Sequence, residues 1–353
     1  MKHGPLRQRC ACGAIDVHTH VVPADFPRYA GRGSGARWPA MAPAQACHRS
    51  VMIDGKVFRT VPPSSWDGAA RAQDMARLGI AHQVLSPMPE LLSYWLDAAD
   101  GAAMCRHLNG VVAALVAADP ARFTGLAAVP LQDVGLAIRE LEHAVNELGL
   151  AGVELGSNID GVPLGDPRLL PFFEAAEALG AAVFVHALRP AGMERLVGPP
   201  ALEYALGYPT EVGLAAASMI TGGTLARCPR LRIAFSHGAG TLALLLPRLQ
   251  HAWSVMPGLR GEGAASPVEL ARRMYVDELV YDERAIRHLA ETFGVSQLLL
   301  GSDYPFPIQD ADPAGRLAAL GLPDGDHAAV AYENALRWLD GEAPSTHHTR
   351  NTA

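Results

Sequence analysis

The stretch AIDVHTH, residues 14–20, places two histidines one residue apart at the end of an apolar run. In a β-strand, side chains two positions apart point to the same face, so His18 and His20 would converge on one point. Imidazole is a common metal ligand. The stretch alone leaves two interpretations open, a metal site or an incidental pair. The rest of the chain has to supply the other ligands.

Similar short apolar or β-branched runs recur along the chain, and each is followed by a longer amphipathic segment. The eight strand candidates are residues 14–17, 82–87, 123–130, 151–156, 181–187, 232–238, 273–277 and 296–305. Helix-start aspartates (Asp97, Asp133, Asp166, Asp282) and helix-end glycines (Gly79, Gly149, Gly180, Gly294) fall between them. Eight such units predict an α/β protein with a parallel (β/α)₈ TIM barrel. We expect one domain over residues 14–340, with flexible termini at 1–13 and 341–353.

An insertion interrupts this order between the first strand and the first helix. Residues 21–65 are rich in Pro, Gly and Arg, and the first good helix follows at 66–78. Within the insertion, VMIDGKVFRTV (51–61) alternates around Asp54-Gly55, which is a strong signal for a two-residue hairpin. We expect a small β lid over the mouth of the barrel.

Composition excludes several classes of protein. Of the 353 residues, 49% are hydrophobic and 18% charged, which favours a large core over disorder. The net charge of −7 is spread along the chain without a Lys/Arg run, so we expect no nucleic-acid partner. Five cysteines without a C-x-x-C pair argue against a disulfide framework, and the segment with Cys10 and Cys12 is interpreted as flexible rather than metal-binding. No signal peptide and no run of 18 apolar residues is found, so we expect a cytoplasmic protein with no membrane partner.

The active site of such a barrel collects at the carboxyl ends of its strands. The candidates that stand there are His18, His20, His186, His237 and Asp303. A single histidine ending an apolar strand is more often a core residue, but five such side chains on strand ends favour a metal site. Imidazoles and a carboxylate suit zinc or a similar divalent ion. His82 and His288 lie at a strand start and inside a helix, and are interpreted as structural.

Short sequence motifs along the chain make this interpretation more specific. AIDVHTHVVP (14–23), DGKVFR (54–59), LSYW (92–95), SMITGG (218–223), FSHGAG (235–240) and LLGSDYPFP (299–307) occur in order over most of the chain. They resemble the amidohydrolase superfamily (amidohydrolase family 2), and within it the α-amino-β-carboxymuconate-ε-semialdehyde decarboxylase family. The resemblance implies a zinc-dependent, non-oxidative decarboxylase of a carboxylated muconate semialdehyde or a related unsaturated or aromatic acid.

The resemblance also assigns residues. It implies that His18, His20, His186 and Asp303 bind one zinc ion, and that His237 is the catalytic histidine beside it, with Asp303 or His237 as proton shuttle. Arg59 matches a lid arginine that holds a substrate carboxylate. Arg248 matches an arginine that reaches into the neighbouring subunit, which implies a homodimer. Without the resemblance, both arginines would be interpreted as ordinary surface residues.

Two features limit what the resemblance implies about substrate. The Trp-containing stretch that follows the family's third histidine ligand is replaced here by HALRPAGMERL (186–196), and the family's triple glycine after the catalytic histidine reads Gly238-Ala239-Gly240. A mononuclear metal-dependent hydrolase of a lactone or amide, an activity that the superfamily also contains, stays as an alternative. Two-metal hydrolases of the superfamily usually carry a lysine at the end of strand four. Here that end reads GVELG (152–156), with Glu154 and no lysine, which favours a single metal.

Overall fold

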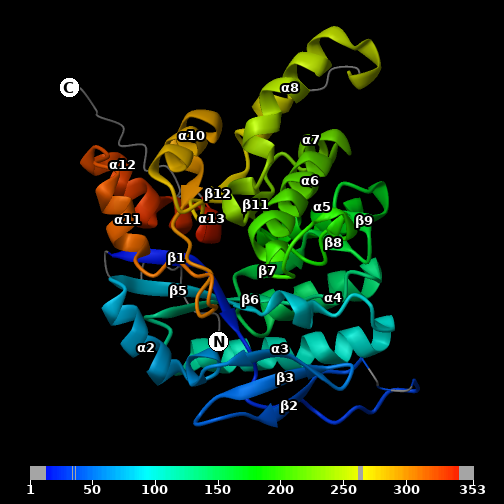
Figure 1. The fold of residues 1–353 in the computed structure, drawn as a ribbon. Helices are drawn as coiled ribbons and strands as arrows, with labels where there is room; N and C mark the ends of the chain where they lie inside the picture. Colours follow the sequence, from blue (N-terminus) through cyan, green and yellow to red (C-terminus); the bar gives the residue numbers. More distant parts are fainter. Residues whose placement is uncertain (1–12, 34, 36, 261–264, 342–353) are drawn as a thin grey trace, which may run out of the picture.

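Eight parallel strands form the centre of the molecule in the computed structural model, which describes residues 13–33, 35, 37–260 and 265–341 (Figure 1). In sheet order they are β1 (Ala14–Val21), β5 (Ile80–Pro87), β6 (Phe123–Ala127), β7 (Gly152–Gly156), β10 (Ala182–His186), β11 (Arg232–Phe235), β12 (Tyr275–Asp277) and β13 (Leu298–Leu299). The sheet closes where the Val17 N–H donates to the Leu300 carbonyl at 2.9 Å and the Asp303 N–H donates to the His18 carbonyl at 2.8 Å. The predicted (β/α)₈ barrel is confirmed.

Helices surround the barrel between successive strands. They are α2 (Gly68–Arg77), α3 (Ala98–Ala118), α4 (Val134–Asn146), α5 (Leu170–Leu179), α6 (Tyr208–Thr221), α7 (Thr224–Arg227), α8 (Leu242–Val255), α9 (Pro267–Ala271), α10 (Glu283–Phe293), α11 (Pro313–Ala319), α12 (Asp324–Ala328) and α13 (Asn334–Asp340). Asp133 and Asp282 accept hydrogen bonds from first-turn N–H groups, as an N-cap does. Gly180 ends α5 with φ +62°.

The interior of the barrel is filled by apolar side chains at its amino-terminal end. Ile15 and Val17 of β1 pack with Phe184 at this end, and all three side chains are fully buried. Trp338 of α13 covers this end, since its indole N–H donates to the Arg232 carbonyl at the start of β11. The carboxyl ends of the strands are left for polar side chains.

The insertion forms a three-stranded antiparallel sheet of β2 (Ala40–Pro43), β3 (Arg49–Ile53) and β4 (Lys56–Val61). The predicted hairpin is present, because Asp54 and Gly55 turn the chain with φ +53° and +71°, the left-handed pair that a tight two-residue hairpin needs. One strand, β2, was not predicted.

The long helix α3 has the length and hydropathy of a membrane span. Its apolar side is used within the fold, because Met104, Leu108 and Val112 are buried in the core. The predicted flexible termini, with Cys10 and Cys12, lie outside the described residues apart from Gly13 and Gly341.

Candidate metal centre

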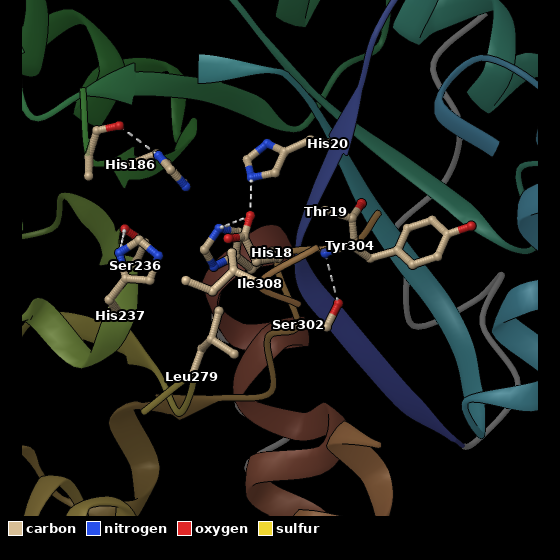
Figure 2. Close-up of polar contacts among 12 residues, drawn as sticks. His18, Thr19, His20, His186, Ser236, His237, Leu279, Ser302, Tyr304 and Ile308 are labelled. Carbon is tan, nitrogen blue, oxygen red and sulfur yellow. Dashed lines mark hydrogen bonds and ion pairs between the residues drawn. The ribbon is translucent and has the colours of Figure 1, made fainter. Parts of the chain in front are cut away.

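Strand ends bring the predicted site residues to one place. His18 and His20 lie near the end of β1, where a register shift against β5 falls between Asp16 and Thr19. His186 is the last residue of β10, and His237 and Asp303 lie in the segments that follow β11 and β13. Figure 2 shows the four imidazole rings around a common space.

Short distances confirm that these groups converge. The ring centroid of His18 lies 5.1 Å from that of His20 and 5.0 Å from that of His186. The Asp303 Oδ1 atom lies 3.0 Å from His20 Nε2 and 3.5 Å from His18 Nε2. One ligand atom from each of His18, His186, His237 and Asp303 falls within 4.8 Å of the others.

The atoms that face this space are buried, and apart from the contacts of Asp303 with His20 and His18 they have no hydrogen-bond partner among the described residues. They are Nε2 of His18, His20 and His186, and Oδ1 of Asp303. A buried polar atom without a partner is costly, and four of them together match the donors that a divalent cation takes. The residues therefore fit a metal ion.

The opposite ring nitrogens fix the orientation of these imidazoles. His18 Nδ1 lies 2.7 Å from Asp277 Oδ2, and His186 Nδ1 lies 2.8 Å from the Ala187 carbonyl. His20 Nδ1 lies 3.4 Å from the Pro87 carbonyl. Because an acceptor holds the Nδ1 proton, the lone pair of Nε2 is directed at the shared space, as in metal-binding histidines.

Burial and charge set the protonation of the cluster. Burial lowers the pKa of His20 to about 4, and it lowers the pKa of His186 well below its ordinary value. Burial would raise the pKa of Asp303, but His20 and His18 hold it well below its usual range. For His18, burial is outweighed by Asp277 and Asp303, and the pKa rises to about 9. An ionised carboxylate beside neutral imidazoles is the state that binds a cation, which would displace the remaining proton.

His237 differs from the other three histidines. It is only partly buried, has φ +54°, and lines the cavity above the cluster. Its Nδ1 lies 3.2 Å from the Ser236 hydroxyl, and burial followed by the charge of His18 lowers its pKa. His237 is thus placed to meet a bound molecule with a neutral imidazole.

A cavity of about 430 Å³ opens onto this cluster. Arg59 of β4 lines it, with the guanidinium 4.1 Å from the ring centroid of Phe306 and a side chain only 15% exposed. The inserted sheet therefore brings a cation to the site, as predicted. Arg248 is exposed on α8 and does not line the cavity of its own chain.

Two carboxylates at strand ends were not assigned roles from the sequence. Asp277, the last residue of β12, holds His18 and also accepts hydrogen bonds from the backbone N–H groups of Gly238 and Leu279. The predicted seventh strand already ended on this aspartate, so the signal was present. Glu154 of β7 is fully buried, with its Oε2 3.8 Å from His20 Nδ1, and burial raises its pKa to about 8.

Comparisons with known proteins agree with this geometry. Residues 15–341 match the model of the amidohydrolase family. The chain is 37% identical over 301 residues to 2-amino-3-carboxymuconate-6-semialdehyde decarboxylase from Dictyostelium discoideum, covering 85% of this chain and 83% of that protein. Among solved structures, IDCase from Metarhizium anisopliae superposes with a TM-score of 0.78 at 22% identity, covering 94% of this chain and 98% of that one. A dihydroxybenzoic acid decarboxylase from Polaromonas with bound manganese gives a TM-score of 0.73 at 19% identity, with 94% and 98% covered.

The protein belongs to the amidohydrolase family of enzymes. The resemblance described from the sequence motifs is therefore confirmed, including the similarity to the carboxymuconate-semialdehyde decarboxylases.

Proposed function

We propose that this enzyme is a zinc-dependent, non-oxidative decarboxylase of a carboxylated muconate semialdehyde or a related unsaturated or aromatic acid. The observation that carries the proposal is the cluster of four buried atoms that suit a metal ion, beside a cavity that His186, Asp303 and Arg59 of the insertion all line. The similarity to a 2-amino-3-carboxymuconate-6-semialdehyde decarboxylase supports the type of reaction.

The proposed metal ligands are His18, His20, His186 and Asp303. Three imidazole nitrogens and one carboxylate oxygen suit zinc, although the Polaromonas relative holds manganese. When bound, such an ion supplies Lewis-acid stabilisation of negative charge on the reacting molecule. No lysine stands at the end of β7, which supports a single ion per chain.

The chain's own residues perform the other tasks. Arg59 holds a substrate carboxylate with the planar two-donor fork of its guanidinium. When CO₂ leaves, the electron pair of the broken C–C bond remains on carbon, and a proton must be delivered there. His237 is partly exposed to the cavity and supplies or orients that proton, with Asp303 as the other candidate for the transfer.

A homodimer would complete the site. Helix α8 extends away from the barrel (Figure 1), and it carries exposed apolar side chains, Leu244 at 75% and Leu245 at 51%. Leu244 also lines the cavity, and the exposed Arg248 follows it one turn further along α8. We propose that a second subunit packs on α8, with each Arg248 donated across the interface, and that the enzyme acts in the cytoplasm.

The test is a product assay with the zinc-loaded enzyme. Candidate unsaturated and aromatic acids are incubated, and CO₂ release is compared with acid formation from lactones and amides. The proposal expects CO₂ without net hydrolysis. Sustained hydrolysis without CO₂ would instead support the mononuclear hydrolase.

A further inference from the structure

A buried carboxylate stands beside the arginine of the cavity. Glu90 follows β5 in the short helix η2 (Pro89–Leu92) and lines the same cavity as Arg59. Its Oε1 lies 3.8 Å from Arg59 Nη2 and accepts a hydrogen bond of 3.1 Å from the Tyr208 hydroxyl. Its Oε2 is buried and has no hydrogen-bond partner among the described residues. The Glu90 side chain is only 11% exposed.

This arrangement is unfavourable for a simple carboxylate ligand. An acid held by Arg59 would bring its negative charge next to a second negative charge in a site of low polarity, where like charges repel strongly. Burial raises the pKa of Glu90, while Arg59 and Tyr208 oppose that rise. The cost of the buried acid is offset when the ligand also brings a hydrogen-bond donor.

We infer that Glu90 is a specificity-determining residue that selects acids carrying an N–H or O–H donor next to the carboxylate held by Arg59. The inference rests on the proposed function in that Arg59 is taken to bind the substrate carboxylate. Because the Arg59 and Glu90 head groups lie 3.8 Å apart, a ligand whose carboxylate and donor sit on neighbouring carbons can reach both. Tyr208 is a positioning residue here, because its hydroxyl fixes one oxygen of Glu90.

The experiment compares two ring acids of nearly equal shape. 2-Aminobenzoate has an amino group beside the carboxylate, and 2-methylbenzoate has a methyl group there. One N–H of the amino group bonds to the acid's own carboxylate, and the second N–H stays available to donate to Glu90. Binding of each acid to the zinc-loaded full chain is measured by calorimetry. We expect the wild type to bind 2-aminobenzoate with a Kd about 10-fold or more below that of 2-methylbenzoate. This ratio corresponds to one hydrogen bond to a charged group.

Variants separate this role from a structural one. Glu90→Met keeps the length of the side chain and should abolish the preference, whereas Glu90→Gln keeps an acceptor oxygen and should restore part of it. Glu211→Gln is the control, since Glu211 is equally buried but is held by Asn158 and the Ala191 N–H away from this cavity. Its preference should equal that of the wild type. If Glu90→Met does not fold, Glu90→Gln serves as the test. Its preference for 2-aminobenzoate over 2-methylbenzoate should be smaller than that of the wild type.

Several outcomes would overturn the inference. They are equal binding of the two acids by the wild type, no binding of 2-aminobenzoate, or an unchanged preference in a folded Glu90 variant. Release of CO₂ is measured separately. A retained preference without any CO₂ release would contradict the proposed function alone, and CO₂ release without a preference would contradict this inference alone.

Discussion

Each imidazole in the cluster is oriented by the partner of its other ring nitrogen. Asp277 and two backbone carbonyls hold Nδ1 of the three proposed ligands, which leaves Nε2 for the cation. His237 has a hydroxyl in that position and reaches the cavity instead. The same residue type is thus held in two different ways within one site.

This difference predicts the behaviour of His237→Ala. Since His237 is not one of the four proposed zinc ligands, the variant should keep its full zinc content. It should lose about 10²–10⁴-fold in kcat, the usual contribution of a positioned acid or base. Elemental analysis and steady-state kinetics on one preparation provide the check. Unchanged turnover would remove His237 from the mechanism.

Arg59→Ala tests the substrate anchor. Loss of a charged, partly buried hydrogen-bond donor should raise KM by about 10- to 100-fold. The metal content should stay unchanged, because the guanidinium stacks on Phe306 rather than on a ligand. Arg59→Lys is the matched control, because it keeps the positive charge but not the planar two-donor guanidinium. Its KM should lie between those of the wild type and Arg59→Ala. A loss of zinc from Arg59→Ala would contradict the role in substrate binding.

Glu154 predicts a dependence of stability on pH. Burial raises its pKa from 4.5 to about 8, so the folded protein favours the protonated acid. The stability from this group is complete below pH 4.5 and is lost as the pH rises through 8. In the metal-free wild type, we expect Glu154 to lower the free energy of unfolding by roughly 3–5 kcal/mol between about pH 5 and 9. In Glu154→Gln this decrease should be absent. The free energies of unfolding of both proteins are measured by urea titration at both pH values. An equal change with pH in the wild type and the variant would contradict the raised pKa of Glu154.

At the scale of elements, the site is a consequence of where strands end. Alternation and apolar runs located all eight strands of the barrel, and strand ends are the positions where a barrel collects chemistry, so His186 and Asp303 could be placed before any coordinates. The hairpin at Asp54-Gly55 was equally predictable, because few residues tolerate that turn. Strand β2 gave no such signal, since AMAP is short and largely unburied.

The sequence alone could not predict which side chains from distant segments would contact one another. Nothing in residues 88–92 indicated that Glu90 would meet Arg59 and Tyr208, because these residues come from three separate segments that only the closed barrel brings together. Asp277 stood at a predicted strand end, but its bond to His18 spans 259 positions. Side-chain partners of this kind depend on register and closure rather than on local pattern.

Two glycines predict opposite effects on stability. Gly110 is exposed in α3, and an added Cβ would have nothing within 4 Å, so Gly110→Ala should stabilise the helix by about 1 kcal/mol. At Gly152 in β7 a Cβ would lie 1.8 Å from the Ala182 carbonyl oxygen of β10. Gly152→Ala should therefore destabilise the barrel, and its midpoint of thermal unfolding should fall while that of Gly110→Ala rises. A Gly152→Ala variant as stable as the wild type would contradict this packing of β7 on β10.

At the scale of the whole molecule, the proposed donation of Arg248 across a dimer predicts complementation. In this proposal Arg59 acts in its own subunit and Arg248 in the neighbour. A dimer of one Arg59→Ala and one Arg248→Ala chain would then contain one intact site and one doubly damaged site. Co-expression at equal levels should give about a quarter of wild-type activity, since half of the dimers are mixed and each has one working site. Each homodimer alone should be nearly inactive when the assay is run at substrate concentrations below the wild-type KM, where a raised KM lowers the rate in full. Mixed dimers no more active than the homodimers would show that Arg248 does not act across the interface.

The central claim is that four side chains from three strand ends hold one cation. The most direct measurement is anomalous diffraction at the zinc edge from a crystal of the zinc-loaded protein. The account predicts one strong peak per chain, about 2.0–2.2 Å from Nε2 of His18, His20 and His186 and from a carboxylate oxygen of Asp303. No peak, or a peak elsewhere with these four residues unligated, would contradict it.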